Sequence, residues 1–158
     1  MAPYDVTPIG WVHSSRSDPI DDDWDAVAAS IVLDEARFGK ESIQGLEAFS
    51  HIEVVYLFDR VDPARLELGA RHPRGNPEWP AVGIFAQRAK LRPNRLGVTA
   101  CRLREVDGLT LHVDGLDAID GTPVLDVKPV MAEFLPRGEV VQPAWSHELM
   151  ATYWTPAH

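Results

Sequence analysis

The segment LGVTACRLREVDGLTLHV (96–113) carries the strongest fold signal in the sequence. Two runs rich in β-branched and apolar residues, 96–106 and 109–113, lie on either side of the dipeptide Asp107-Gly108. Asp-Gly is favoured in two-residue hairpin loops because such loops need residues that accept positive φ angles. The segment therefore predicts two antiparallel strands joined at Asp107-Gly108.

The same reading extends outward to five more strands. They are expected at 9–14, 30–34, 51–61, 81–88 and 123–129, where β-branched and aromatic residues dominate. Helical periodicity is weak, and the best helix candidates are 40–49 and 143–154. Short strands with little helix predict a mainly β fold, a small antiparallel β-barrel of about seven strands with few short helices.

The length of 158 residues fits one domain, which we expect to span 1–158, with a core over 6–136 and a C-terminal tail over 137–158. The acidic stretch RSDPIDDDWD (16–25) is expected to form a surface loop. The proline-rich stretch 62–80 is expected to be a long connection. Loops of that length are usually functional or disordered.

Charge is unevenly distributed along the chain. The net charge is −9, which argues against non-specific nucleic-acid binding. Residues 61–105 nevertheless hold 9 basic and 4 acidic residues, and we call them the basic island. Uneven charge of this kind indicates a local anionic partner better than the total does.

The remaining composition concerns the compartment and the classes of chemistry. No apolar run approaches the roughly 18 residues of a membrane span, the N-terminus does not resemble a secretory signal, and one cysteine fits a reducing compartment. We therefore expect a cytoplasmic protein. No phosphate-loop, dinucleotide or nucleophile-elbow motif is present, and no histidine or cysteine pattern indicates a metal site. Cys101, in mid-strand, is expected to be a packed small hydrophobe and not a nucleophile.

Two motifs contain the candidate chemistry. In GIFAQRAKLRPNRLGV (83–98) a strand enters a basic loop, where Asn94 tolerates left-handed dihedrals. This loop is either an ordinary charged turn or a loop shaped to meet an anion or a cofactor. In GLDAIDGTPVLDVKP (115–129), Asp126 and Lys128 are two residues apart and so share one face of a strand. They form either a surface ion pair or the polar wall of a pocket.

Together these motifs resemble those of the TsaA-like family of S-adenosylmethionine-dependent β-barrel tRNA methyltransferases (TrmO, YaeB-type). IGWVHS (9–14), IQGLEAFSHIEVVYLF (43–58) and HPRGNP (72–77) extend the resemblance over most of the chain. It implies a barrel that binds S-adenosylmethionine, acts as a homodimer with the cofactor near the subunit interface, and N6-methylates threonylcarbamoyladenosine in the tRNA anticodon loop. We expect a short member without the extra C-terminal domain of longer ones, needing no metal and no membrane.

The resemblance also implies site residues. Those expected at the cofactor are Phe85, Arg88, Leu91, Arg92, Pro93, Asn94, Leu125, Asp126, Lys128 and Pro129. Asp126 is suited to accept a hydrogen bond from the cofactor, while Arg92 or Lys128 meets its carboxylate. Asp126 and His13 are candidates for accepting the proton of the methylated nitrogen. The arginines expected to contact tRNA phosphates are Arg65, Arg71, Arg74, Arg95, Arg102 and Arg104.

Two departures from the family leave other functions open. The stretch 16–25 replaces a glutamine-proline-glycine segment, and Arg95 stands where the family usually has proline. The net charge of −9 and the acidic stretch favour, as an alternative, a small-molecule methyltransferase with the same cofactor pocket. A non-catalytic module that only binds S-adenosylmethionine is the third alternative.

Overall fold

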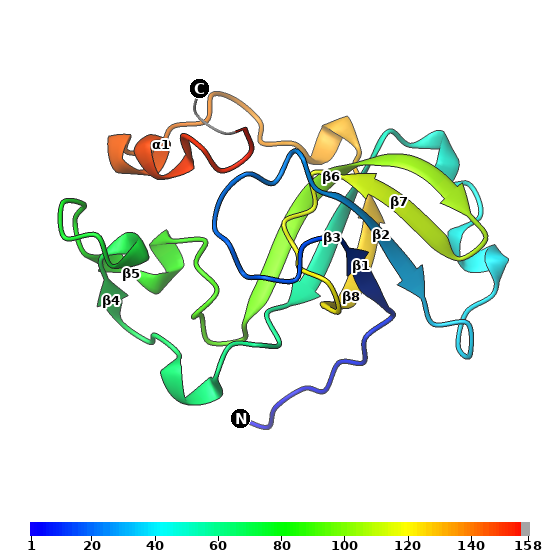
Figure 1. Ribbon diagram of the computed structural model, residues 1–158, viewed down its shortest axis with the longest axis horizontal. Coiled ribbons are helices and arrows are strands. Elements are labelled where there is room, and N and C mark those ends of the chain that lie inside the picture. Colours follow the sequence, from blue (N-terminus) through cyan, green and yellow to red (C-terminus); the bar gives the residue numbers. More distant parts are fainter. Residues whose placement is uncertain (156–158) are drawn as a thin grey trace.

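Six antiparallel strands close into a barrel in the computed structural model, which describes residues 1–155 (Figure 1). The strand order around the barrel is β1-β2-β7-β6-β3-β8. The strands are β1 (Gly10–Ser14), β2 (Ala28–Leu33), β3 (His51–Leu57), β6 (Leu96–Asp107), β7 (Thr110–Asp114) and β8 (Pro123–Pro129). The predicted mainly β barrel is confirmed, and its six strands are close to the seven expected.

The hairpin that fixes this topology joins β6 to β7. Asp107 pairs with Thr110, so the two-residue loop is Gly108-Leu109, one residue later than predicted. Gly108 has a φ of 60°, and a type II′ turn requires glycine at this first loop position. Because β6 has 12 residues, it pairs with β3 over its first half and with β7 over its second half.

The barrel interior is filled by alternate residues of each strand, as the pleat requires. Along β6 the inward positions are Gly97, Thr99, Cys101 and Leu103, all buried. Gly97 lies opposite Tyr56 of β3, and a Cβ atom there would come within 2.4 Å of the tyrosine ring. Glycine at this position therefore makes room for a large aromatic side chain inside the barrel.

A separate lobe, residues 58–95, is inserted between β3 and β6. It contains a small two-stranded sheet of β4 (Ala70–Arg71) and β5 (Val82–Gly83). The predicted strand 81–88 was wrong beyond Gly83, because the chain turns into a short 3-10 helix that buries Ile84. The predicted strand 51–61 ends early at Leu57, where the chain turns into the lobe.

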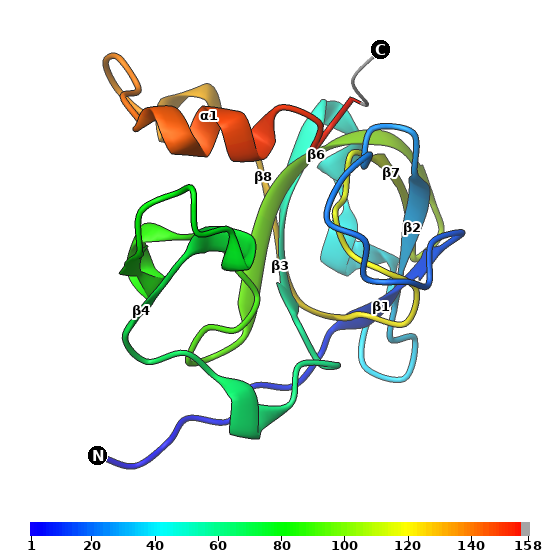
Figure 2. The same ribbon diagram turned by 60° about the vertical axis from the view of Figure 1, so that its left-hand side comes forward.

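Short helices complete the described chain. The predicted helix 40–49 is present as two 3-10 turns, and the predicted helix 143–154 as α1 (Ala144–Met150). The 3-10 helices are Lys40–Ile43, Leu46–Ala48, Pro63–Arg65, Pro73–Gly75, Ile84–Ala86 and Ala132–Phe134. Figures 1 and 2 show α1 beside the lobe, and Trp79 of the lobe donates a 2.7 Å hydrogen bond to Glu148 of α1. Residues 156–158 of the expected tail lie outside the described residues, and no helix among those described is long and apolar enough to cross a bilayer.

Candidate functional site

The basic loop that follows β5 is held by internal hydrogen bonds. Gln87 is buried, and its side-chain amide donates to the carbonyl oxygens of Arg71 (3.1 Å) and Val82 (2.9 Å). Arg92 donates from Nη1 to the carbonyl oxygens of Gln87 (2.8 Å) and Ala89 (3.3 Å). A loop that is cross-linked in this way holds its side chains in defined directions, as a binding loop must.

The RPN turn within this loop is closed by a 2.9 Å hydrogen bond from the amide of Arg95 to the carbonyl of Arg92. The left-handed residue is Arg95, with a φ of 53°, and not Asn94 as the sequence suggested. Arg95 also donates from Nη1 to the carbonyl of Val61 at 3.0 Å. Because proline is locked near a φ of about −65°, it does not fit this backbone conformation at position 95.

The second motif forms β8. Asp126 and Lys128 both point outward and form an ion pair of 3.5 Å with side chains that are 52% and 67% exposed. The two residues therefore form an ion pair on the outer surface of β8, where both side chains remain accessible. The pairing with β3 shifts between Val55 and Tyr56, which leaves Leu125 in a β-bulge. Bulges re-aim side chains and are common next to active sites.

The two motifs meet on one outer face of the barrel. Val55 of β3 pairs with Asp126 on one side and with Val98 of β6 on the other. The carbonyl of Val98 accepts a 2.6 Å hydrogen bond from Arg88 Nη2. Two strand spacings separate Asp126 from Val98, roughly 10 Å. We call this surface, formed by the outward residues of β6, β3 and β8, the open face.

Apolar side chains are exposed on the open face and in the lobe beside it. Phe85, Leu96 and Val98 are 79%, 39% and 38% exposed. Of the other residues expected at the cofactor, Leu91, Arg92 and Pro93 are half-buried in the basic loop and Asn94 is exposed at its turn. Pro129 is half-buried at the end of β8.

The two candidate proton acceptors lie on neighbouring strands of the barrel, because β8 pairs with β1. Asp126 belongs to the open face, whereas His13 points outward from β1, where it pairs with Ser30 of β2. His13 and Trp11 line a shallow groove of about 630 Å³. Within residues 1–155, no group of three or more His, Cys, Asp or Glu side chains is placed to hold a metal ion.

The arginines expected to contact RNA differ in their surroundings. Arg65 and Arg102 are exposed, and Arg71 is half-buried in β4. Arg104 forms a 3.0 Å ion pair with Asp114. Arg74 is paired with acidic residues of the loop 16–25, as described below.

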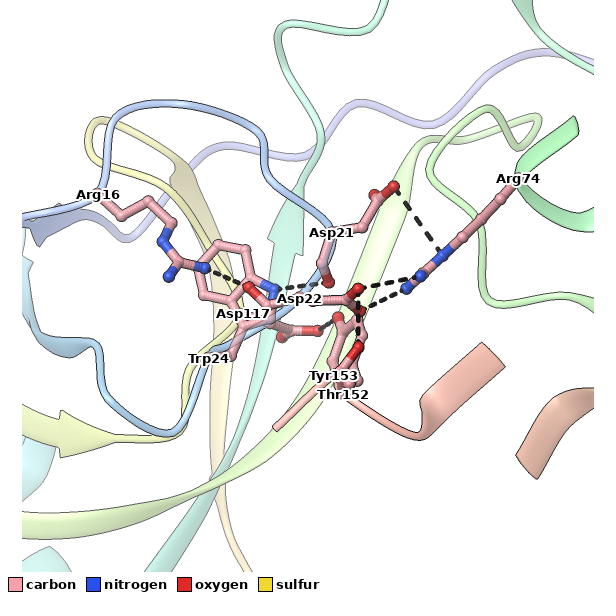
Figure 3. A network of polar contacts seen from close by, with 8 residues as sticks. All are labelled: Arg16, Asp21, Asp22, Trp24, Arg74, Asp117, Thr152 and Tyr153. Carbon is pink, nitrogen blue, oxygen red and sulfur yellow. Dashed lines mark hydrogen bonds and ion pairs between the residues drawn. The ribbon is translucent and has the colours of Figure 1, made fainter. Parts of the chain in front are cut away.

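Sequence reasoning missed the polar centre of the barrel. Asp117 accepts hydrogen bonds from Tyr56 (2.9 Å), from Thr99 and from Tyr153. Tyr153 belongs to the C-terminal segment, residues 151–155 after α1, and Figure 3 shows it beside Asp117. The partners are 61, 18 and 36 residues away from Asp117 in sequence. No local pattern links residues this far apart, so only the fold reveals the cluster.

Burial is the largest influence on the pKa values of the two tyrosines in this cluster. It raises the pKa of Tyr56 and of Tyr153, and the negative charge of Asp117 raises both further. Both phenols therefore stay protonated at neutral pH and donate to the carboxylate. Three hydroxyl donors on one carboxylate form a fully paired network that fastens the C-terminal segment to the barrel.

The buried position of Cys101 affects the pKa of its thiol. Burial, with the charges of Asp117 and Asp114, raises the pKa of its thiol to about 12. Only the thiolate reacts with alkylating reagents, so we expect no modification of native protein by iodoacetamide between pH 7 and 9 and rapid modification in urea. Mass spectrometry measures the adduct. Equal modification rates in the native and unfolded states would contradict the predicted burial.

Comparison with known proteins identifies a matching family. The model of the family described as tRNA-methyltransferase O N-terminal domain matches residues 13–134. A human tRNA (adenine(37)-N6)-methyltransferase is 34% identical over 117 residues, which cover 74% of this chain and 26% of that protein. A probable S-adenosyl-L-methionine-binding protein of Pyrococcus abyssi is 38% identical over 136 residues, which cover 84% of this chain and 71% of that protein.

Solved structures share the fold. The crystal structure of TrmO from P. aeruginosa superposes with a TM-score of 0.74 at 25% identity, covering 92% of this chain and 62% of that chain. The tRNA (adenine(37)-N6)-methyltransferase of Escherichia coli is 38% identical over 104 residues, 61% of this chain and 43% of that protein. The chain thus spans less than half the length of the human and E. coli relatives.

Proposed function

The chain belongs to the tRNA-methyltransferase O N-terminal domain family, and on that basis we propose that it is a S-adenosylmethionine-dependent methyltransferase that N6-methylates threonylcarbamoyladenosine in the tRNA anticodon loop. The observation that carries the proposal is the meeting of the two sequence motifs on the open face. Their residues are far apart in the chain, and a shared cofactor site accounts for that meeting.

The chemistry of the open face fits the cofactor. S-adenosylmethionine carries an adenine, hydroxyl and amine donors, and a carboxylate. Phe85, Leu91 and Leu125 supply apolar surface for the adenine. Asp126 accepts from a hydroxyl or amine, and Arg92 or Lys128 pairs with the carboxylate. Pro93, Asn94 and Pro129 shape the backbone around these groups, and Arg88 joins the loop to β6.

A second copy of the chain is part of the proposal. A cofactor on an open face needs a second wall, because methyl transfer benefits from excluding water. The exposed apolar side chains of Phe85, Leu96 and Val98 are suited to burial against a partner. We therefore propose a homodimer that works in the cytoplasm, with the cofactor near the subunit interface.

Positioning carries most of the proposed mechanism. When bound, the cofactor supplies a methyl group already activated on a sulfonium. The chain's task is to hold the acceptor nitrogen in line with that methyl group, which is catalysis by orientation. The nitrogen must also lose a proton. Its position on the open face supports Asp126 over His13 as the acceptor.

The acceptor is tested by methyl transfer from radiolabelled cofactor at several salt concentrations. The proposal expects label in tRNA, with a rate that falls as salt rises because phosphate contacts weaken. Label in the isolated nucleoside that is insensitive to salt would instead identify a small-molecule methyltransferase. Cofactor binding without transfer to either would identify a non-catalytic module.

A further inference from the structure

The acidic segment, residues 18–25, is folded into a defined shape (Figure 3). The guanidinium of Arg16 donates to the carbonyls of Asp22 (2.8 Å) and Asp23 (2.7 Å) and lies 4.4 Å above the Trp24 ring. Trp24 is 4% exposed and donates from Nε1 to the carbonyl of Asp21 at 3.1 Å. These contacts hold the backbone of residues 21–24 in a fixed conformation.

The C-terminal segment supports this shape from the other side. The backbone amides of residues 23–25 donate to the carbonyls of residues 152–154 at 3.0, 2.9 and 2.9 Å. Thr152 donates from its hydroxyl to Asp22 Oδ2 at 3.1 Å. Tyr153 is fastened to the barrel through Asp117. The Asp22 carboxylate is thus aimed by two chain segments that lie far apart in the sequence.

This carboxylate meets an arginine of the lobe. Arg74 donates from Nη2 to Asp22 Oδ1 at 2.9 Å and from Nη1 to Asp22 Oδ2 at 3.3 Å, and Asp21 lies 3.9 Å from Arg74 Nε. Two parallel bonds from one guanidinium to two oxygens are also the geometry with which arginine binds a phosphate. Asp22 therefore occupies the fork that Arg74 would offer to an RNA phosphate.

The ion pair is exposed enough to open. The side chains of Arg74 and Asp22 are 27% and 33% exposed, so a ligand can reach the pair from solvent, and water partly screens the attraction between the two charges. Arg74 is also part of the basic island, where the proposed function places RNA contacts. A phosphodiester offers the Arg74 guanidinium two oxygens, as the carboxylate does, and can take its place.

Resting on the proposed function, we propose that Asp22 masks Arg74 and so gates RNA binding at this point of the basic island. In the free protein, Asp22 satisfies Arg74. An RNA phosphate binds Arg74 only by replacing this carboxylate. The gate thereby lowers the affinity for RNA, because the ion pair must open before a phosphate can bind Arg74.

The test compares Asp22→Asn with Asp18→Asn, an equal change of charge at an exposed residue of the same segment. Unmodified tRNA carries a fluorophore, and anisotropy at one fixed salt concentration gives the affinity of each variant. We expect Asp22→Asn to bind tRNA about two- to fivefold more tightly than the wild type. Asp18→Asn is expected to show a smaller gain, since it opens no ion pair with Arg74.

A double-mutant cycle ties the gain to Arg74. Arg74→Ala is expected to lower tRNA affinity more in the Asp22→Asn background than in the wild type, because only there is the guanidinium unmasked. Thr152→Val is a charge-neutral second variant: it removes the hydroxyl that holds Asp22 and is expected to raise affinity in the same direction. Urea unfolding confirms that each variant is folded.

Three results would overturn the gate. They are an unchanged or weaker affinity of Asp22→Asn, an equal gain in Asp18→Asn, or a gain that persists when Arg74 is alanine. A weaker affinity together with lower stability would show that the pair is only a brace between the lobe and the C-terminal segment. Methyl transfer is measured on the same samples. Gated binding without transfer would contradict the proposed function alone, and transfer without gating would contradict this inference alone.

Discussion

Asp117→Ala is expected to lower the free energy of unfolding by about 3 to 5 kcal/mol. The substitution leaves the hydroxyls of Tyr56, Thr99 and Tyr153 without the carboxylate that they share inside the barrel. Each hydrogen bond to a charged group is worth about 1.5 to 3 kcal/mol, and the three are coupled, so they do not add fully. Urea unfolding followed by tryptophan fluorescence measures the loss.

Asp120→Ala is the matched control for this prediction. Asp120 lies three residues later in the same motif and accepts one exposed hydrogen bond, from the amide of Ser14 at 3.0 Å. Its loss is expected to cost about 1 kcal/mol or less. Equal stabilities of the two variants would show that the Asp117 cluster does not hold the barrel and the C-terminal segment together.

Arg92→Ala is expected to weaken S-adenosylmethionine binding by about 100-fold. Two effects combine. The variant lacks the charge-assisted bond proposed for the cofactor carboxylate, and the loop loses the bonds from Arg92 to the carbonyls of Gln87 and Ala89. Together these are worth about 3 kcal/mol, which is about two factors of ten in affinity. Calorimetry on the purified variant measures the dissociation constant.

Arg92→Lys and Asp126→Ala test two further contributions to cofactor binding. Lysine keeps the charge but lacks the planar fork, so Arg92→Lys is expected to bind the cofactor with intermediate affinity. Asp126→Ala is expected to weaken binding from the β8 side of the open face. Arg137→Ala, an exposed arginine outside both motifs, should bind like the wild type. Unchanged affinity in both Arg92→Ala and Asp126→Ala would remove the cofactor from the open face.

Local patterns in the sequence were sufficient for the barrel. Alternation along β6 and the glycine at its hairpin follow from the pleat and from turn geometry, and both are visible in neighbouring residues. The strand predicted over 81–88 was wrong beyond Gly83, because the apolar residues of this segment match a strand pattern. In the fold, the buried side-chain amide of Gln87 donates hydrogen bonds to the carbonyl oxygens of Arg71 and Val82 instead. That interaction depends on a residue 16 positions away.

The candidate site, too, was only partly predictable from the local sequence. The basic loop and the β8 motif were visible as residue types, but their meeting across Val55 required the register of three strands. The acidic stretch 16–25 was expected to be a surface loop, and its ion pair with Arg74 spans 52 residues. The left-handed residue of the RPN turn is Arg95, because the turn continues into backbone and side-chain contacts with 58–61.

The mass of the nucleosides in treated tRNA tests the central claim most directly. Unmodified tRNA carrying threonylcarbamoyladenosine is incubated with purified protein and S-adenosylmethionine, then digested and analysed by mass spectrometry. The proposed function predicts that threonylcarbamoyladenosine gains one methyl group at N6, and that Arg92→Ala lowers the gain at a cofactor concentration that saturates only the wild type. A digest in which this nucleoside keeps its mass, with protein that is folded and binds the cofactor, would contradict the assignment.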